Sequence, residues 1–210
     1  MNLIDDLYDE IERVEKNVVT SKKYILMNNS VVTYIHNFVN PFDSKKIFDD
    51  LFTNVDWVQG TYNMYGRIVL TPRLLSAMRD ANDDIRDVYK ITDSVEWTPL
   101  VYELKRSLEI LIGRKLRYAQ LNYYRSGSDY IGFHTDSEVG SSGLIVSVSL
   151  GATRRFVLQY KSDPKKKFEL DLFDGSVLIM NVAAAKTHWK HSIPRAKMSD
   201  PRINLTFRDS

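Results

Sequence analysis

Three residues, two near the middle of the chain and one near its end, have the types and the spacing of a metal site. His134 and Asp136 are two positions apart, and side chains two apart on an extended strand point to the same side. His191 follows later and can supply a third ligand. Two imidazole nitrogens and one carboxylate form the ligand set of non-heme Fe(II) oxygenases, which leaves positions open for a cosubstrate and oxygen. Alone, a His-x-Asp triplet is weak evidence, because most such triplets are solvated turns.

The segment 202–208 alternates polar and apolar side chains. A period of two predicts one polar face and one apolar face: Arg202, Asn204, Thr206 and Arg208 against Ile203, Leu205 and Phe207. The two arginines are roughly 20 Å apart on a strand, so they cannot bind one carboxylate together. A guanidinium offers a carboxylate a planar fork and stays charged. Arginines at two ends of a pocket therefore suit a cosubstrate with an acid at each end, although a half-exposed strand is the alternative for this segment alone.

These motifs resemble those of the AlkB family of Fe(II)/2-oxoglutarate dioxygenases, which repair alkylated nucleobases. The resemblance runs from about residue 34 to residue 208 and is dense from residue 119 onward. Three motifs carry it: His-x-Asp-x-Glu at 134–138, His-Ser-Ile-Pro at 191–194 and Arg-x-Asn-Leu-Thr-Phe-Arg at 202–208. The resemblance implies Fe(II) on His134, Asp136 and His191, with 2-oxoglutarate and O2 as cosubstrates and ascorbate as a reductant in vitro.

The resemblance also implies which residues hold 2-oxoglutarate. Arg202 would pair with the carboxylate far from the iron, and Arg208 would lie near the iron-side carboxylate and Asp136. Four more residues are expected beside them: Asn122, Tyr124, Asn204 and Thr206. His188, in the same motif as His191, is expected to support the fold instead.

A second group of residues is expected to meet the substrate base. Met64, Tyr65 and Gly66 are predicted to form a hairpin tip that carries apolar groups outward, although such a tip alone is more often a minor packing feature. In the resembling proteins the matching tip wedges into the DNA stack where the damaged base leaves. Arg73 follows the tip at the expected spacing. Glu138 occupies the family position that faces the exocyclic nitrogen of the base, with a solvated loop acid as the alternative.

Two basic clusters are candidates for binding phosphates. In the resembling proteins basic loops at corresponding places grip the DNA backbone, whereas a solvated hairpin tip is the alternative for such a charge run. If these loops bind phosphates, affinity falls steeply with salt, because each neutralised phosphate releases counterions. The residues concerned are Lys165, Lys166, Lys167, Arg195 and Lys197.

The implied reaction is the oxidative demethylation of 1-methyladenine and 3-methylcytosine in DNA, which releases formaldehyde and restores the base. The family usually has an aromatic lid that helps to hold the flipped base. This chain has an acidic segment at residues 83–90 instead, and only Tyr89 could take the place of the lid aromatics. This departure keeps open the same chemistry on RNA or on a substrate that is not a nucleic acid. A nucleic-acid-binding module without catalysis is the third alternative.

Length and composition bound the class of protein. A chain of 210 residues and 24.4 kDa suits one domain with at most an extension. The formal net charge of +2 does not by itself indicate a nucleic-acid binder. The absence of cysteine excludes disulfides and zinc thiolates. Without a signal peptide or an apolar run of membrane-spanning length, we expect a soluble intracellular monomer, in nucleus or cytoplasm.

Periodicity outlines the elements that must position these residues. Apolar residues at helical spacing predict an amphipathic helix over 3–18, either packed on the core or serving as a partner-binding arm. A second helix is predicted from a cap at Asp43 or Ser44 to Phe52, and a third from Thr98 to Gly113. Strands are expected at 31–39, 118–124, 144–150, 155–160, 168–173, 176–182 and 202–208, with a hairpin turn at 174–175.

The predicted fold class is α+β and mainly β, with a double-stranded β-helix (jelly-roll) core braced by N-terminal helices. Residues 1–30 are expected to form an N-terminal helical extension and residues 31–210 an AlkB-like dioxygenase domain. Within that domain, a nucleotide-recognition hairpin region is expected at about 57–97 and the jelly-roll catalytic core at about 114–210.

Overall fold

The computed structural model describes residues 19–64, 66–80, 95–136, 143–197 and 200–208. In chain order the elements are β1 (Thr20–Leu26), the 3-10 helix η1 (Met27–Asn29), β2 (Ser30–His36), α2 (Pro41–Asn54), β3 (Thr61–Met64), β4 (Arg67–Leu70), β5 (Leu74–Arg79), α3 (Pro99–Ile112), β6 (Tyr118–Tyr124), β7 (Ile131–His134), β8 (Leu144–Gly151), β9 (Arg154–Tyr160), β10 (Lys167–Leu172), β11 (Val177–Asn181), the π-helix η2 (Ala183–Thr187), β12 (Trp189–Ile193) and β13 (Arg202–Arg208).

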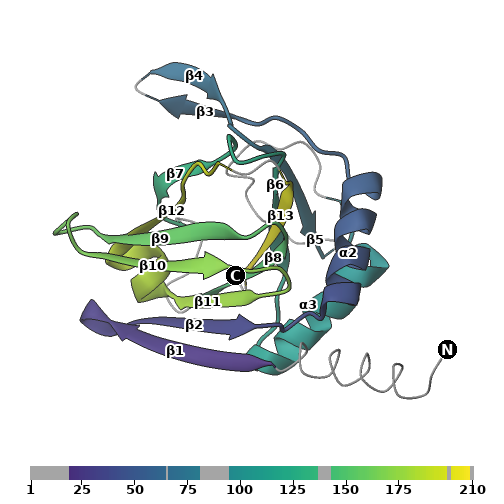
Figure 1. Cartoon of the computed structure of the whole chain (residues 1–210), viewed down its shortest axis with the longest axis horizontal. Helices are drawn as coiled ribbons and strands as arrows, with labels where there is room; N and C mark the ends of the chain where they lie inside the picture. Colours follow the sequence, from purple (N-terminus) through teal and green to yellow (C-terminus); the bar gives the residue numbers. More distant parts are fainter. Residues whose placement is uncertain (1–18, 65, 81–94, 137–142, 198–199, 209–210) are drawn as a thin grey trace, which may run out of the picture.

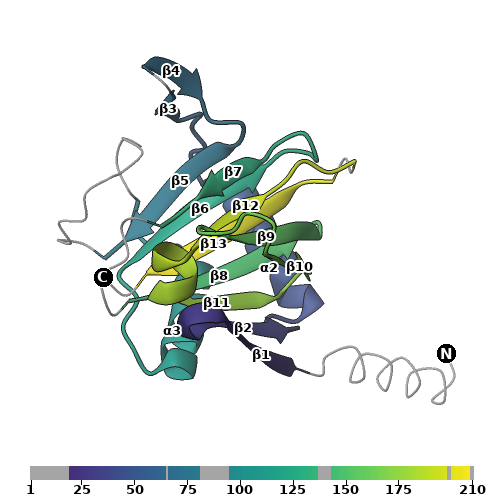
Figure 2. The same ribbon diagram turned by 90° about the vertical axis from the view of Figure 1, so that its left-hand side faces the viewer.

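Two antiparallel sheets build the molecule (Figure 1). The large sheet has the order β1-β2-β11-β8-β13-β6-β5, and the small sheet has the order β10-β9-β12-β7. Strands β6 to β13 divide equally between the two sheets, and apolar side chains from both sheets meet in one cluster between them. The predicted jelly-roll core and mainly-β class are confirmed. Among the described strands, β3 and β4 form a two-stranded sheet of their own, which projects from the body of the molecule, as Figure 2 also shows.

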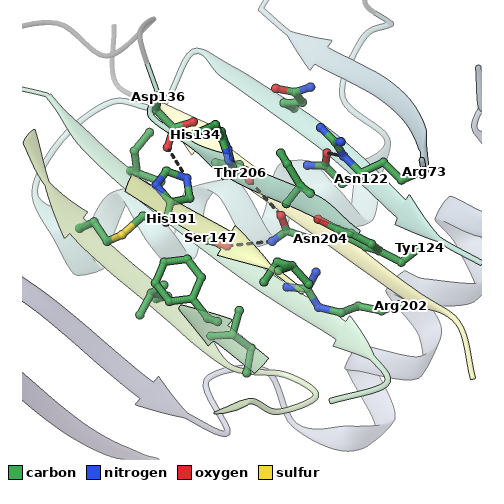
Figure 3. A pocket seen from close by; sticks show the side chains of 18 of the residues that line it. Arg73, Asn122, Tyr124, His134, Asp136, Ser147, His191, Arg202, Asn204 and Thr206 are labelled. Carbon is green, nitrogen blue, oxygen red and sulfur yellow. Dashed lines mark hydrogen bonds and ion pairs between the residues drawn. The ribbon is translucent and has the colours of Figure 1, made fainter. Parts of the chain in front are cut away.

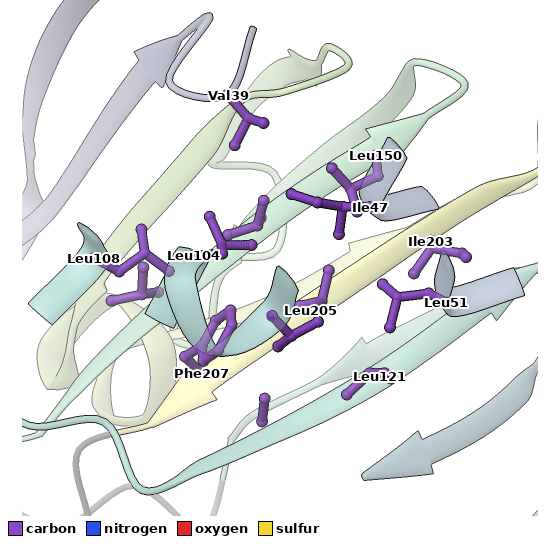
Figure 4. Packing of buried hydrophobic residues seen from close by; sticks show 14 of the residues in the cluster. Val39, Ile47, Leu51, Leu104, Leu108, Leu121, Leu150, Ile203, Leu205 and Phe207 are labelled. Carbon is purple, nitrogen blue, oxygen red and sulfur yellow. The ribbon is translucent and has the colours of Figure 1, made fainter. Parts of the chain in front are cut away.

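Helices α2 and α3 pack on the outer face of the large sheet (Figures 1 and 4). Four buried side chains of the helices meet side chains of β6, β8 and β13: Ile47, Leu51, Leu104 and Leu108. Burying one such side chain stabilises the fold by about 1.5–3 kcal/mol. The helices therefore brace the sheet from outside, as predicted.

The ends of α3 follow from local chemistry. Thr98 Oγ1 accepts a hydrogen bond from Val101 N, and Pro99 occupies the first turn, where a missing N–H costs nothing. Gly113 ends the helix with φ +67° while its N–H donates to the Glu109 carbonyl. Both predicted ends of this helix are confirmed.

The start of α2 differs from the prediction. The cap is Asn40, whose Oδ1 accepts from Asp43 N at 2.9 Å, and Pro41 takes the first helical position. The predicted cap at Asp43 or Ser44 is therefore wrong, because an Asn-Pro pair earlier in the chain already starts the helix. Ser44 is buried, and its hydroxyl donates to the carboxylate of Asp174 instead.

The predicted hairpin turn at 174–175 is also wrong. Strand β10 pairs with β9 in the small sheet, whereas β11 pairs with β2 and β8 in the large sheet, so the turn carries the chain between sheets. Gly175 has φ +67°, and a Cβ there would lie 2.0 Å from the Val39 carbonyl oxygen, which excludes any side chain. Asp174 Oδ1 accepts from Gly151 N at 2.8 Å and ties the turn to the end of β8.

The N-terminal boundary needs correction as well. Strand β1 pairs with β2 along its whole length, with Thr20 opposite His36. The boundary predicted at residue 30 thus falls inside this pair of strands, and residues 20–26 form part of the large sheet, not of a helical extension. The helix predicted over 3–18 lies outside the described residues. Within the described ranges, no helix has the length and apolar character to cross a membrane.

A buried ion-pair group secures the last turn of α3. Glu109 is 9% exposed and accepts hydrogen bonds from Leu116 N at 2.8 Å and from Lys115 Nζ at 3.1 Å. Lys105 Nζ lies 3.1 Å from Glu109 Oε1. Burial raises the pKa of Glu109, but the Leu116 N–H and the two lysines lower it more, so the net pKa lies below its ordinary value.

We expect Glu109→Gln to lower the free energy of unfolding by about 2 kcal/mol at neutral pH, because it leaves the buried Lys105 with less compensation. A depressed pKa adds stability above the unfolded-state pKa and loses it as the pH falls, so the gap to wild type should narrow at about pH 3. Urea unfolding at both pH values checks this. Glu103→Gln, 69% exposed on the same helix, is the control and should change stability little. An equal loss at both pH values would contradict the charge argument.

Candidate metal centre

Two histidines meet across a pair of strands in the small sheet. Strands β7 and β12 are antiparallel, and their register places His134 opposite His191. The two imidazole centroids are 4.2 Å apart, and the His191 ring also stacks on Phe156 at 5.7 Å. Strand pairing thus brings together two ligands that are distant in the sequence.

Asp136, the second residue after the end of β7, completes the group (Figure 3). Its Oδ2 lies 3.2 Å from His191 Nε2, and its Oδ1 accepts from Arg208 Nη2 at 3.1 Å. The ligand atoms of His134, Asp136 and His191 all lie within 4.8 Å of one another. The structure therefore brings the three predicted ligands to one point.

The protonation states of these side chains suit a cation. Burial lowers the pKa of His134, and neighbouring His191 lowers it further, so the imidazole is neutral. His134 Nδ1 lies 2.9 Å from the Gly132 carbonyl oxygen, which can only accept, so Nδ1 carries the proton and Nε2 keeps its lone pair. Burial raises the pKa of Asp136, but His191 and Arg208 lower it more, so the carboxylate is ionised.

The group of His134, Asp136 and His191 also contains a buried oxygen whose bonding a metal ion would complete. Asp136 Oδ2 is buried, and apart from His191 Nε2 at 3.2 Å no group of the described residues approaches it as a donor. A buried carboxylate oxygen with so few donors is costly unless it meets a cation. Two imidazoles and one carboxylate are the donor set that Fe(II) oxygenases use, and an adjoining cavity leaves room for further ligands. The residues present therefore fit Fe(II).

The cavity extends from the metal group along the inner face of β6 and β13 (Figure 3). The alternation predicted for 202–208 is confirmed, since its polar members line the cavity: Arg202, Asn204, Thr206 and Arg208. Its apolar members belong instead to the core under the helices: Ile203, Leu205 and Phe207. One strand thus builds the site on one face and the core on the other.

Arg202 lies at the other end of the cavity from Asp136 and His191 (Figure 3). It is 1% exposed, and its Nη2 donates to Ser149 Oγ at 2.9 Å. Its Nε and Nη1 have no hydrogen-bond partner among the described residues. Burial lowers the pKa of Arg202 to about 10, so the guanidinium is still charged at neutral pH. This end of the cavity is therefore built to receive an anion.

Two polar residues between these ends bond mainly to the protein itself. Asn204 Nδ2 donates to Ser147 Oγ and to the Val148 carbonyl, both at 2.8 Å. Thr206 Oγ1 donates to Asn204 Oδ1 at 3.0 Å. These bonds fix the orientation of the cavity wall before any ligand arrives.

Strand β6, the neighbour of β13 in the large sheet, continues this wall. Asn122 Oδ1 accepts from Arg73 Nε at 2.7 Å, and Arg73 is 3% exposed. Arg73 was expected beside the hairpin tip, and the structure places it in the wall of the metal cavity. The Tyr124 ring lies near two guanidinium groups, 5.1 Å from that of Arg202 and 5.3 Å from that of Arg154.

Arg154 is a residue that spacing in the sequence did not reveal. It is 2% exposed, and its Nη2 donates to the carbonyls of Asp129 at 2.8 Å and Pro194 at 2.6 Å. It thereby connects the segments that flank the ligand-bearing strands β7 and β12, and its guanidinium lies by the ring of Tyr124. Its partners are remote in the sequence, so no local pattern could identify it. Gln120, by contrast, shares the period-two face of Asn122 and lines the cavity.

Of the other residues expected to meet substrate, those that the structure describes are not part of the cavity lining. Gly66, with φ +80°, forms the turn between β3 and β4, and Met64 is the last residue of β3. Arg195 stacks on Tyr130, with 4.5 Å between the guanidinium and the ring centroid. The remaining basic residues are exposed: Lys165, Lys166, Lys167 and Lys197. Tyr65, Tyr89 and Glu138 lie outside the described residues.

Residues 31–208 match the family model of the 2OG-Fe(II) oxygenase superfamily. The match spans most of the chain, and the chain belongs to this superfamily. The protein is thus a dioxygenase that uses Fe(II) and 2-oxoglutarate.

Within the superfamily the chain is similar to AlkB proteins. It is 31% identical over 179 residues to the DNA oxidative demethylase ALKBH2 of Homo sapiens, which covers 79% of this chain and 68% of that protein. It is 32% identical over 222 residues to the DNA oxidative demethylase ALKBH2 of Arabidopsis thaliana, covering 91% and 70%. Against ALKBH2 of Bos taurus the identity is 31%, and the chain spans 64% of that protein's length. These relatives place the chain in the AlkB family.

Solved structures agree on the fold. The structure of OsALKBH1 superposes with a TM-score of 0.57 at 17% identity, covering 90% of this chain and all of that one. A 2OG-Fe(II) oxygenase family oxidoreductase from Burkholderia pseudomallei gives a TM-score of 0.53 at 15% identity, covering 79% and 78%. At such identities the likeness concerns the fold alone.

The two histidines of the segment 188–191 should differ in metal binding. We expect His191→Ala to weaken binding of Co(II), an oxygen-stable stand-in for Fe(II), by more than about a hundredfold, because one of three ligands is lost. His188→Ala is the matched control and should bind like wild type, since His188 is not in the ligand group. Titration calorimetry measures both, with circular dichroism to confirm folding. Equal losses in the two variants would contradict the assignment.

Proposed function

We propose that the protein demethylates N-alkylated bases in DNA, with 1-methyladenine and 3-methylcytosine as substrates. The observation that carries this proposal is a metal triad at one end of a cavity whose other end holds a buried, partly unpaired arginine. The relatives named as DNA oxidative demethylases support the choice of DNA as substrate.

In this proposal the row of polar residues on β13 holds 2-oxoglutarate. Arg202 pairs with the carboxylate far from the metal, through the N–H groups that have no partner among the described residues. Arg208 holds Asp136 ionised and oriented by its 3.1 Å hydrogen bond, so that the carboxylate is ready for the cation. Asn122, Tyr124 and the bonded pair Asn204–Thr206 shape the wall between the two ends.

Bound Fe(II) would activate O2, so that one oxygen atom enters the N-methyl C–H bond and the other enters succinate as 2-oxoglutarate loses CO2. The hydroxymethyl group then leaves the base nitrogen as formaldehyde, and the base is restored. The chain's own part is to hold the ligands and to keep His134 neutral with Nε2 unprotonated.

The projecting hairpin supports a duplex as the substrate. Ile68 and Leu70 of β4 are 80% and 57% exposed, and they belong to a two-stranded ribbon outside both sheets. Exposed apolar side chains on a projecting ribbon suit insertion into a base stack, which costs a few kcal/mol that a weakened, damaged pair lowers. The tip itself includes Tyr65, outside the described residues, and its role stays a proposal.

Mass spectrometry of a duplex oligonucleotide with one 1-methyladenine, incubated with Fe(II), ascorbate and 2-oxoglutarate, tests the function directly. We expect conversion to adenine that requires 2-oxoglutarate and that Asp136→Ala abolishes. Single-stranded DNA and matched RNA form parallel arms. Conversion of RNA alone would move the substrate class to RNA, and no conversion in any arm despite consumption of 2-oxoglutarate would overturn the proposal.

The basic turn between β9 and β10 should contribute to DNA affinity through phosphate contacts. We expect the triple variant Lys165→Ala, Lys166→Ala, Lys167→Ala to bind a duplex more weakly. The slope of log affinity against log salt, which is negative, should become less steep by up to about 3. Fluorescence anisotropy at several salt concentrations measures this slope. Lys45→Ala with Lys46→Ala, exposed on α2 over the outer face, is the control. An unchanged slope in the triple variant would remove this turn from the interface.

A further inference from the structure

Gln120 is a buried amide in the cavity with an unmet hydrogen bond. It lies on β6, is 4% exposed and lines the same cavity as the metal group. Its Nε2 has no hydrogen-bond partner among the described residues. The two neighbouring amides differ, because Asn122 bonds to Arg73 and Asn204 bonds to Ser147.

The register of the strands places Gln120 toward the metal end. Gln120 lies opposite Thr206 on β13, and the next inward residue of that strand, Arg208, reaches Asp136. Arg202 lies opposite Tyr124, at the other end of the same pair of strands. On its other side β6 pairs with β5 and not with β8, the strand that carries Ser147 and Ser149. Gln120 therefore lines the cavity toward its metal end, which the methyl group of a base must reach in the proposed reaction.

A buried N–H donor without a partner is costly, and an apolar side chain of similar size would avoid that cost. Such a group is expected where a ligand completes the bond. The ligand atom must be an acceptor, because Nε2 can only donate. The question is which of the two proposed bases carries an acceptor next to its methyl group.

The two bases differ at one atom beside the methylated nitrogen. In 3-methylcytosine the methylated nitrogen lies between the amino-bearing carbon and the carbonyl carbon, so an oxygen acceptor flanks the methyl group. In 1-methyladenine the corresponding flank is a C–H group, which cannot accept. The amino group on the other flank is common to both bases.

We propose that Gln120 is a specificity-determining residue that donates a hydrogen bond from Nε2 to the ring carbonyl oxygen of 3-methylcytosine. It thereby favours methylated pyrimidines with a carbonyl beside the methylated nitrogen over 1-methyladenine. This inference rests on the proposed function and names its preferred substrate.

The test compares kcat/KM on two oligonucleotides that differ only in the lesion, 3-methylcytosine or 1-methyladenine. We expect Gln120→Leu to lower kcat/KM roughly tenfold on 3-methylcytosine and less than about twofold on 1-methyladenine, as for the loss of one hydrogen bond. Gln120→Glu, which keeps the shape but loses the donor, should lose at least as much on 3-methylcytosine. Gln159→Leu makes the same change on β9 outside the cavity and should leave the ratio of the two values unchanged.

Two further measurements separate this role from others. The melting temperature of Gln120→Leu should equal or exceed that of wild type, because an unpaired buried donor is removed. Its Kd for 2-oxoglutarate, measured anaerobically with Co(II), should be unchanged. Equal losses on the two lesions, a weakened affinity for 2-oxoglutarate, or full activity of Gln120→Glu on 3-methylcytosine would each overturn the inference. A wild-type protein that converts neither lesion would overturn the proposed function, and this inference with it.

Discussion

The buried ion pair between Arg208 and Asp136 joins the two halves of the molecule at the metal centre. Arg208 belongs to β13 in the large sheet, and Asp136 follows β7 in the small sheet, with 3.1 Å between Nη2 and Oδ1. Two buried charges are tolerated only when they are paired with good geometry. The orientation of the carboxylate toward His134 and His191 therefore depends on how the sheets pack, because a shift of either sheet would separate Arg208 from Asp136.

Strand β13 is the element in which stability and chemistry meet. Its apolar side chains lie among the leucines of α2 and α3, and its polar side chains form a wall of the cavity. The large burial on the helix side fixes the register, because a slip of one residue would exchange the two faces. The same hydrophobic packing that stabilises the fold thus keeps Arg202 and Arg208 on the cavity face.

Several unmet hydrogen bonds lie in this one cavity. Among the described residues, Asp136 Oδ2, the Arg202 guanidinium and Gln120 Nε2 are buried without full partners, and all three side chains line it. Buried polar groups are normally satisfied, so such a group marks a place where a ligand completes the bonding. Asp136 requires a cation, Arg202 an anion and Gln120 a hydrogen-bond acceptor. Fe(II), 2-oxoglutarate and a base carbonyl are partners of these three kinds.

The sequence by itself determined the features that depend on local geometry. The spacing of His134 and Asp136, the alternation through 202–208 and the caps of α3 follow from strand and helix periods and from the chemistry of Thr98, Pro99 and Gly113. His191 was identified from its motif, His-Ser-Ile-Pro at 191–194, which matches a family pattern. Its spacing from His134 and Asp136 does not by itself indicate a ligand.

The tertiary structure alone decided which strands are neighbours. The turn at Asp174–Gly175 crosses between sheets because β11 pairs with β2 and β8, residues far away in the chain. The same holds for the burial of Arg73 in the cavity wall, the bonds of Arg154 and the unpaired amide of Gln120. Each depends on contacts between remote segments, which local pattern cannot specify because pairing and register are set by the packing of the whole domain.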